Sequence, residues 1–437
     1  MSSTLVGVIG ILLMLVIFLT RMSVAYVMAL VGFLGFSYLI SLEGGLNLLA
    51  RNIYGPFASY DLTTIPLFIL MGQIAFNSGI SKRLYQTAYK FLGSVRGGLA
   101  MATVSSCTAF GAVCGSSPAT ASIMTTVGMP EMRRYNYTDD LAAGSVASGG
   151  GLGMIMTPSV VLIIYGVLTE QSIGALFVAG IIPAILLTVL FIACIYITCT
   201  LNPEKGPAGE KYTLSEKIKS LTGLVDTLIV FVISIGGLFF GFFSPTESAA
   251  IGAAGVLVGS LIRKQITWAG FLKSLYETLS TSCMVLFLIA GAVVFSKFLA
   301  VTRIPFDIAS WVGGLSFPSF VIIGIIIFIY FLGGCFMDSL GLIMLTIPIF
   351  FPVVISLGYD PIWFGIIIVL VAEMGVITPP VGLNVYVVYG VSKTVVGEVK
   401  LETIFKGIVP FLLAVVVGII ILIMFPQIIL FLPNLMY

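Results

Sequence analysis

The feature that most restricts the fold of this chain is a long apolar stretch with one charged residue at its centre. Between Asp307 and Asp360 the only charged side chain is Asp338. A carboxylate at bilayer depth costs a few kcal/mol, so it normally faces protein or a polar cavity. Residues 319–357 are nearly two membrane spans long, with no polar loop between the two. We therefore predict a re-entrant hairpin over 319–357 with its tip at Asp338; in the simpler alternative this carboxylate only caps the following helix.

The composition places the whole chain in a membrane. Hydrophobic residues make up 59% of the sequence and charged residues 9%, against roughly a quarter charged in soluble globular domains. The chain has no histidine, which removes the usual proton shuttle and zinc ligand. Its six cysteines lie mostly in apolar sequence and contain no CxxC pair, so we interpret them as packing residues. The predicted fold class is an all-α polytopic membrane protein whose longest loops are 42–61 and 201–221.

Apolar runs of near-spanning length predict ten spans. A second hairpin is predicted over 97–130, and the amphipathic segments 81–96 and 263–277 are predicted to lie at the membrane interface. The ten runs are 4–20, 22–41, 62–80, 141–168, 172–200, 222–242, 244–262, 278–300, 362–392 and 407–431.

The distribution of basic residues predicts the orientation. If each hairpin returns to its own side, 17 of the 20 Lys and Arg fall in loops on one side of the membrane, and only Arg51, Lys297 and Arg303 on the other. Basic residues concentrate on the cytoplasmic side. Both termini are therefore predicted to lie on the side of the membrane opposite the cytoplasm.

The sequence also contains a repeat. GAVCGSSPATA (111–121) and SGGGLGMIMTPS (148–159) correspond to GGCFMDSLG (333–341) and EMGVITPPVGLN (373–384). Ser116 and Asp338 are separated by 222 positions, as are Pro158 and Pro380. Five predicted spans separate the hairpins, so the two halves are predicted to be inverted. The predicted regions are N-terminal scaffold spans (1–80), repeat 1 (81–200), linking spans with the second interfacial arm (201–300) and repeat 2 (301–437).

Each repeat is predicted to contain two helix breaks, at its hairpin and within its second helix, 141–168 or 362–392. At each break a small-residue stretch ends one half-helix and a Ser, Thr or Asp begins the next, usually followed by proline, which is favoured helix-start chemistry. Non-helical backbone at mid-membrane is tolerated where it is buried or lines a cavity, and paired breaks typically build a transporter's binding site. The alternative is that glycine and proline only kink packed helices.

These breaks predict one anion site flanked by two cation sites. Half-helix N-termini present free N–H groups to an anion, and C-terminal carbonyls with a hydroxyl or carboxylate suit Na⁺. The predicted substrate-binding residues are Ser117, Thr157, Asp338, Ser339, Thr378 and Asn384. The predicted Na⁺ ligands are Gly115, Ser116, Gly151, Gly153, Gly334, Asp338, Gly375 and Thr378.

Two further carboxylates are open to more than one interpretation. Glu247 directly follows Pro245-Thr246 at the start of an apolar run and either caps that helix or serves the site. Glu373 lies in apolar sequence beside the last break and either lines the site or pairs with a neighbour.

By these residues the chain resembles the large membrane subunit of the tripartite ATP-independent periplasmic (TRAP) transporters. The matching motifs extend along the chain and are specific in combination. They are GSSPATA (115–121), MPEMRR (129–134), ASGGGLGMIMTPS (147–159), PTESAA (245–250), MDSLG (337–341) and TPPVGLN (378–384).

The resemblance implies a function and partners. It implies Na⁺-driven import of a small organic anion, usually a carboxylate, by an elevator movement of the hairpins and broken helices. It also implies a periplasmic binding protein that delivers the substrate and a small four-helix membrane subunit, here expected as a separate chain.

Three other functions are alternatives to this one. A stand-alone Na⁺/carboxylate or anion transporter of the same superfamily would need no binding protein. A channel is disfavoured by the closed tips and the absence of rings of charge. An intramembrane enzyme is disfavoured because the sequence shows no nucleophile–base pair and no nucleotide-binding loop.

Overall fold

The computed structural model describes residues 2–18, 22–313 and 317–436. Arg21, which contributes to the predicted charge bias, lies outside these ranges. The described residues form helices and no strand, in agreement with the predicted all-α class.

The helices of the N-terminal half include the first hairpin and the first broken helix. They are α1 (Ser3–Phe18), α2 (Val24–Leu39), α3 (Leu42–Ala58), η1 (Asp61–Thr63), α4 (Thr64–Asn77), α5 (Ile80–Leu92), α6 (Gly98–Cys114), α7 (Ser117–Arg134), α8 (Asp139–Ile155), α9 (Val160–Thr169) and α10 (Ile173–Leu201).

The C-terminal half repeats this order of hairpin, broken helix and long helix. Its elements are η2 (Pro203–Lys205), α11 (Leu214–Leu221), α12 (Val225–Phe239), α13 (Pro245–Ile262), α14 (Trp268–Thr302), α15 (Ile304–Gly313), α16 (Ser319–Phe336), α17 (Ser339–Ser356), α18 (Pro361–Ile377), α19 (Leu383–Val395), α20 (Leu401–Met424), α21 (Gln427–Leu430) and α22 (Pro433–Met436).

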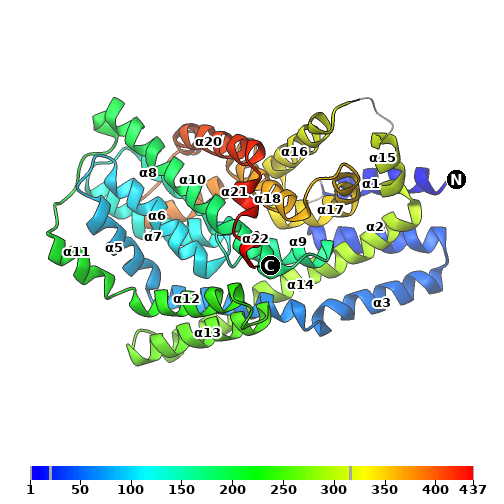
Figure 1. The fold of residues 1–437 in the computed structure, drawn as a ribbon, viewed down its shortest axis with the longest axis horizontal. Coiled ribbons are helices and arrows are strands. Elements are labelled where there is room, and N and C mark those ends of the chain that lie inside the picture. Colours follow the sequence, from blue (N-terminus) through cyan, green and yellow to red (C-terminus); the bar gives the residue numbers. More distant parts are fainter. Residues whose placement is uncertain (1, 19–21, 314–316, 437) are drawn as a thin grey trace.

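The two hairpins and two broken helices are present, as predicted. In Figure 1 the first hairpin, α6–α7, lies toward the left and the second, α16–α17, toward the right, with α18 between them. The hairpins pack crosswise: α7 of the first contacts α19, and α17 of the second contacts α9. Each hairpin therefore also packs on the broken helix of the other half.

Among the described residues, seven helices are long and apolar enough to cross a membrane. The number is eight if α3 and the segment Asp61–Asn77, which meet at 57°, form one broken span. Several predicted spans contain shorter apolar helices among the described residues. The shorter apolar helices are Ser3–Phe18, Val24–Leu39, Gly98–Cys114, Leu228–Phe239, Pro361–Ile377 and Gln427–Met436.

Two of the predicted loop and arm assignments are wrong. The predicted loop 42–61 is mostly helix α3, which Ser41 caps by accepting a hydrogen bond from the amide of Gly44 at 3.0 Å. The predicted arm 263–277 is not a separate helix, because Trp268–Thr302 forms one helix of 35 residues. At about 1.5 Å per residue this helix is roughly 50 Å long. Figure 1 shows it running alongside α2 and α3.

The predicted loop 201–221 also contains a short helix, α11. Thr213 and Glu216 form a reciprocal capping box at its start. The predicted arm 81–96 contains helix α5, which packs on α6 and carries Lys90 in its last turn. Its place at the membrane interface stays a prediction.

Candidate functional site

The tip of the first hairpin has the predicted chemistry. Gly115 ends α6 in the left-handed region at φ +62°, a conformation that glycine adopts without strain. Ser116 is the extended residue before α7, and its side chain makes no capping bond. Helix α7 begins at Ser117 with Pro118 in its first turn, so the free N–H groups of this half-helix are at the predicted place.

At the tip of the second hairpin, Asp338 caps the N-terminus of α17. Its carboxylate accepts hydrogen bonds from the amides of Leu340 at 3.3 Å and Gly341 at 3.2 Å. The side chain is exposed, and α17 begins at the next residue, Ser339. The capping role is therefore confirmed, and a role in transport remains a prediction, since capping does not exclude it.

The caps predicted within the broken helices are wrong. Helix α9 begins at Val160, and its cap is Ser159, which accepts a hydrogen bond from the amide of Leu162 at 3.4 Å. Helix α19 begins at Leu383 after Gly382, and Thr378 instead ends α18. The Thr378 hydroxyl donates to the carbonyl of Met374 at 2.6 Å. In both breaks the proline lies in the connection and not in the first helical turn.

Most of the predicted carbonyl-presenting glycines lie inside helices. Helix α8 continues past Gly151 and Gly153 to Ile155, α16 continues past Gly334, and α18 continues past Gly375. Gly153, Gly334 and Gly375 fall in last turns, where carbonyls lack an intrahelical partner. Of these, the Gly375 carbonyl accepts the amide of Thr378 at 2.9 Å.

Three of these glycines, Gly153, Gly334 and Gly375, lie where helices approach closely. A Cβ on Gly375 would lie 2.6 Å from the Cα of Gly334, and a Cβ on Gly111 would overlap the Cα of Gly153. Each half therefore has one glycine–glycine contact between its hairpin and its broken helix. Close helix packing is therefore observed at these glycines, and the role of Gly153, Gly334 and Gly375 as Na⁺ ligands stays a prediction.

Each hairpin tip also meets the break of its own half, as predicted. A Cβ on Gly115 would overlap the carbonyl oxygen of Pro158, so this tip lies directly against the first break. In the second half, the amide of Val381 in the break donates to the carbonyl of Cys335 near the hairpin tip at 3.3 Å.

A buried polar network joins the two halves. The Ser117 hydroxyl donates to Oε1 of Glu373 at 2.9 Å. The Asn384 amide donates to the Ser117 hydroxyl at 2.7 Å, to the carbonyl of Ala147 at 3.2 Å and to Oε1 of Glu373 at 3.4 Å. Ser117, Glu373 and Asn384 are all buried, so the network links α7 and α8 with α18 and α19 away from solvent.

The central member, Glu373, is absent from the predicted site residues. Its signal in the sequence is clear: it is the only charged side chain between Asp360 and Lys393 and lies two residues before Gly375. What the sequence does not contain is the contact with Ser117, which is 256 positions away.

The other predicted residues lie outside this network. Ser339 and Thr157 are buried, and their hydroxyls have no hydrogen-bond partner among the described residues. Glu247 completes a capping box with Ser244, whose amide donates to its carboxylate at 2.8 Å. Of the two interpretations of Glu247, the structure supports the helix cap.

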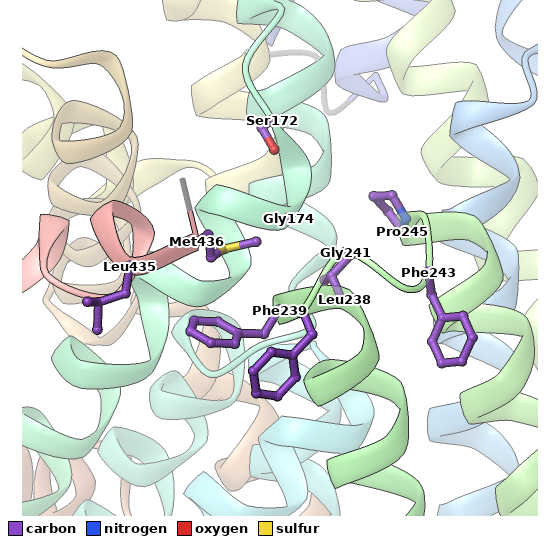
Figure 2. Close-up of a pocket in the computed structure, with 10 residues that line it drawn as sticks. Ser172, Gly174, Leu238, Phe239, Gly241, Phe243, Pro245, Leu435 and Met436 are labelled. Carbon is purple, nitrogen blue, oxygen red and sulfur yellow. The ribbon is translucent and has the colours of Figure 1, made fainter.

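Open cavities among the described residues lie away from the breaks, and two of them have polar residues in their lining. One of about 400 Å³ lies between the α12–α13 turn and the C-terminal helix α22. Figure 2 shows Phe239 and Phe243 beside it, with Leu435 and Met436 on the other side. Its lining includes none of the predicted site residues.

The second open cavity, of about 680 Å³, is lined by α5, α7 and the segment containing Glu210 and Tyr212. The hydroxyls of Tyr212 and Tyr135 donate to the Glu210 carboxylate at 2.8 and 3.0 Å. These bonds hold the pKa of Glu210 below its ordinary value. This cavity also contains none of the predicted site residues.

A family model described as "Tripartite ATP-independent periplasmic transporter, DctM component" matches residues 11–428. The chain belongs to this family. It is 35% identical over 387 residues to the C4-dicarboxylate TRAP transporter large permease protein DctM of Pseudomonas aeruginosa, covering 88% of this chain and 89% of that one. It is 32% identical over 393 residues to the sialic acid TRAP transporter large permease protein SiaM of Vibrio cholerae, covering 90% of each chain.

Two solved structures share the fold of this TRAP permease. The Alcanivorax borkumensis YdaH transporter aligns with a TM-score of 0.65 at 16% identity, covering 88% of this chain and 90% of that one. Neisseria gonorrhoeae MtrF aligns with a TM-score of 0.55 at 16% identity, covering 89% and 85%. The family and the apolar helices identify a multi-pass inner-membrane transporter subunit, which is not an enzyme.

Proposed function

We propose that this TRAP permease couples inward Na⁺ movement to the import of a small organic anion delivered by a periplasmic binding protein. The observation that carries the proposal is that each hairpin tip lies against the helix break of its own half. Ser117 and Ser339 begin half-helices whose free amides suit an anion. Gly153, Gly334 and Gly375 lie in the last turns of half-helices, where carbonyl oxygens suit Na⁺.

The family supports the class of substrate. Relatives of this chain are named for C4-dicarboxylates, sialic acid and isethionate, all of which carry an acidic group. Main-chain amides recognise a small oxyanion of any of these kinds, so the substrate of this chain is proposed as a class, with a carboxylate as the first candidate.

We propose that the hairpins and broken helices move together as an elevator. The crosswise contacts of α7 with α19 and of α17 with α9, and the buried network around Glu373, hold these elements as one body. Helices α2, α3, α4, α13 and α14 pack on one another and form the proposed scaffold. A small four-helix subunit, as a separate chain, is the proposed partner of this scaffold, and both termini are proposed to be periplasmic.

The test is uptake in proteoliposomes that contain this chain and its small subunit, with the binding protein outside. The ligand of the binding protein is first found by thermal-shift screening of dicarboxylates, sialic acids and sulfonates. An inward Na⁺ gradient without ATP is expected to drive accumulation above the external concentration, because no nucleotide-binding motif is present and the breaks suit Na⁺. Equal uptake with K⁺ in place of Na⁺ contradicts Na⁺ coupling. Equal uptake without the binding protein instead supports the stand-alone transporter.

A further inference from the structure

The open cavity of about 680 Å³ between α5, α7 and the segment before α11 has a lining of mixed charge. Its basic side chains are Lys82, Lys90 and Arg134, and its carboxylates are Glu131 and Glu210. Three positive and two negative side chains leave one net positive charge on the lining. The cavity therefore suits a ligand that carries a single negative charge.

Both carboxylates already have partners, whereas the two lysines make no ion pair. Oε2 of Glu131 lies 3.9 Å from the guanidinium of Arg134. The Glu210 carboxylate accepts hydrogen bonds from two tyrosine hydroxyls. No ion pair among the described residues involves Lys82 or Lys90. The positive charge that is open to a ligand is therefore on α5.

Three tyrosine rings form one wall of the cavity. The ring centroid of Tyr89 lies 5.9 Å from that of Tyr135 and 5.7 Å from that of Tyr212. The Tyr89 hydroxyl also accepts a hydrogen bond from the amide of Glu210 at 3.3 Å, and the Lys90 ammonium lies 5.8 Å from the Tyr212 centroid. These contacts hold the wall in place without using the lysine N–H donors. Tyrosine is typical of the boundary between membrane and water.

Helix α11, which follows the lining segment along the chain, exposes an apolar stripe. Leu214, Ile218 and Leu221 are spaced i, i+4 and i+7, so they share one helix face, and all three are exposed. Helix α11 packs on α5, and Figure 1 shows the two side by side. The Lys217 ammonium lies 5.9 Å from the ring centroid of Phe91, an exposed residue at the end of α5. Exposed apolar side chains beside basic ones are typical of helices that lie at the membrane interface.

We propose that this cavity binds the phosphodiester headgroup of an anionic phospholipid, with the phosphate beside Lys82 and Lys90 and the acyl chains along the apolar stripe of α11. A phosphodiester with one negative charge, as in phosphatidylglycerol, neutralises the net charge of the lining. Basic pockets on the cytoplasmic side of membrane proteins are typical sites for such headgroups, and the predicted orientation places α5 on that side. The site is separate from the helix breaks and does not depend on Na⁺ coupling.

The test is the melting temperature of the purified permease in detergent, after removal of bound lipid, titrated with phosphatidylglycerol or phosphatidylethanolamine of the same acyl chains. Phosphatidylglycerol is expected to raise the melting temperature saturably, at a several-fold lower concentration than the zwitterionic lipid. Glycerophosphoglycerol, which is the same headgroup without chains, and inorganic phosphate test for a free phosphate compound. Both are expected to have little effect at the same concentrations, because they cannot cover the apolar stripe.

Two substitutions remove positive charge from the lining at side chains that make no ion pair. Lys82→Gln and Lys90→Gln are each expected to raise the phosphatidylglycerol concentration for half the effect about fivefold, and the double variant about 25-fold. The reason is that one basic residue near an anionic lipid contributes about 1 kcal/mol. Lys273→Gln is the matched control, since this lysine pairs with Glu277 at 3.7 Å on α14 and is not part of the lining. It should titrate like wild type.

Ile218→Ser tests the apolar stripe, since it removes an exposed apolar side chain and leaves the charge of the lining unchanged. It is expected to raise the required phosphatidylglycerol concentration several-fold, and a wild-type titration would contradict the placement of the acyl chains. An equal wild-type response to the two lipids, or a wild-type titration of the double lysine variant, overturns the headgroup site. Equal stabilisation by glycerophosphoglycerol or inorganic phosphate would indicate a free phosphate compound and overturn the lipid. None of these results bears on Na⁺ coupling, which the uptake experiment tests separately.

Discussion

The two halves of the molecule have the same backbone plan but a different distribution of charge. At the spacing of 222 positions, Ser116 of the first half corresponds to Asp338 of the second, and Gly151 corresponds to Glu373. In both pairs the first half carries a small neutral residue and the second half a carboxylate. Gly151 and Glu373 also contact each other across the boundary between the halves.

The two halves share their backbone packing and differ in charge. Each half keeps a glycine–glycine contact that lets its hairpin approach its broken helix, at Gly111 and Gly153 in one half and at Gly334 and Gly375 in the other. The repeat therefore preserves backbone packing. The charge at the two corresponding pairs of positions above is what differs between the halves.

The largest expected effect is on the shared backbone packing. Gly111→Ala and Gly375→Ala each place a methyl group against main-chain atoms of the facing helix, which cannot rotate away. Each is expected to destabilise the permease by about 1–3 kcal/mol, toward the upper end because backbone must move. The measurement is the melting temperature of the purified protein in detergent.

Gly324→Ala in α16 is the control for this pair. A Cβ at Gly324 meets nothing within 4 Å, so its substitution should leave the melting temperature unchanged or slightly raised. If Gly111→Ala and Gly375→Ala behaved like Gly324→Ala, the close contact would not be a structural requirement in either half.

Much of the fold follows from local sequence signals. Helix ends at the first tip agree with prediction because Gly115, Ser116 and Pro118 all favour the same boundary. The caps of the broken helices were not predictable in the same way. Thr157 and Ser159 both have cap chemistry, and only Ser159 makes the bond, because the packing of the first tip against Pro158 fixes the connection.

Two other differences have similar causes. The boundary predicted between an interfacial arm and a span near residue 278 has no residue that ends a helix, so α14 continues through it. The sequence of α3 predicts a loop because it contains Gly44, Gly45 and Pro56, residues that weaken a helix in isolation. The contacts of α3 with α2 and α14 compensate for this weakness. The position of Glu373 beside Ser117 depends on the crosswise packing of the halves, which no local pattern contains.

The second-largest expected effect is on the Na⁺ requirement of transport, and it tests the charge difference between the two hairpin tips. Asp338→Asn keeps the helix cap, since Asn caps about as well as Asp, but removes the charge. If the carboxylate helps to hold Na⁺, half-maximal transport should need more than about tenfold more Na⁺, or roughly 1.4 kcal/mol. Ser116→Asn at the corresponding tip should change the Na⁺ requirement little. The measurement is initial uptake rate against Na⁺ in proteoliposomes. Wild-type behaviour of Asp338→Asn would leave this residue as a helix cap alone.

The smallest effect compares two serines that begin corresponding half-helices, Ser117 and Ser339. Both are buried, but the Ser117 hydroxyl bonds to Glu373 and Asn384, whereas the Ser339 hydroxyl has no partner in the part of the chain that the structure describes. Ser117→Ala leaves the Glu373 carboxylate with one donor fewer and should lower stability by about 1 kcal/mol or somewhat more. Ser339→Ala breaks no hydrogen bond and should leave the melting temperature within experimental error. Equal losses in the two variants would mean that the halves do not differ at these positions. A larger loss in Ser339→Ala would place the principal network in the second hairpin and reverse the comparison.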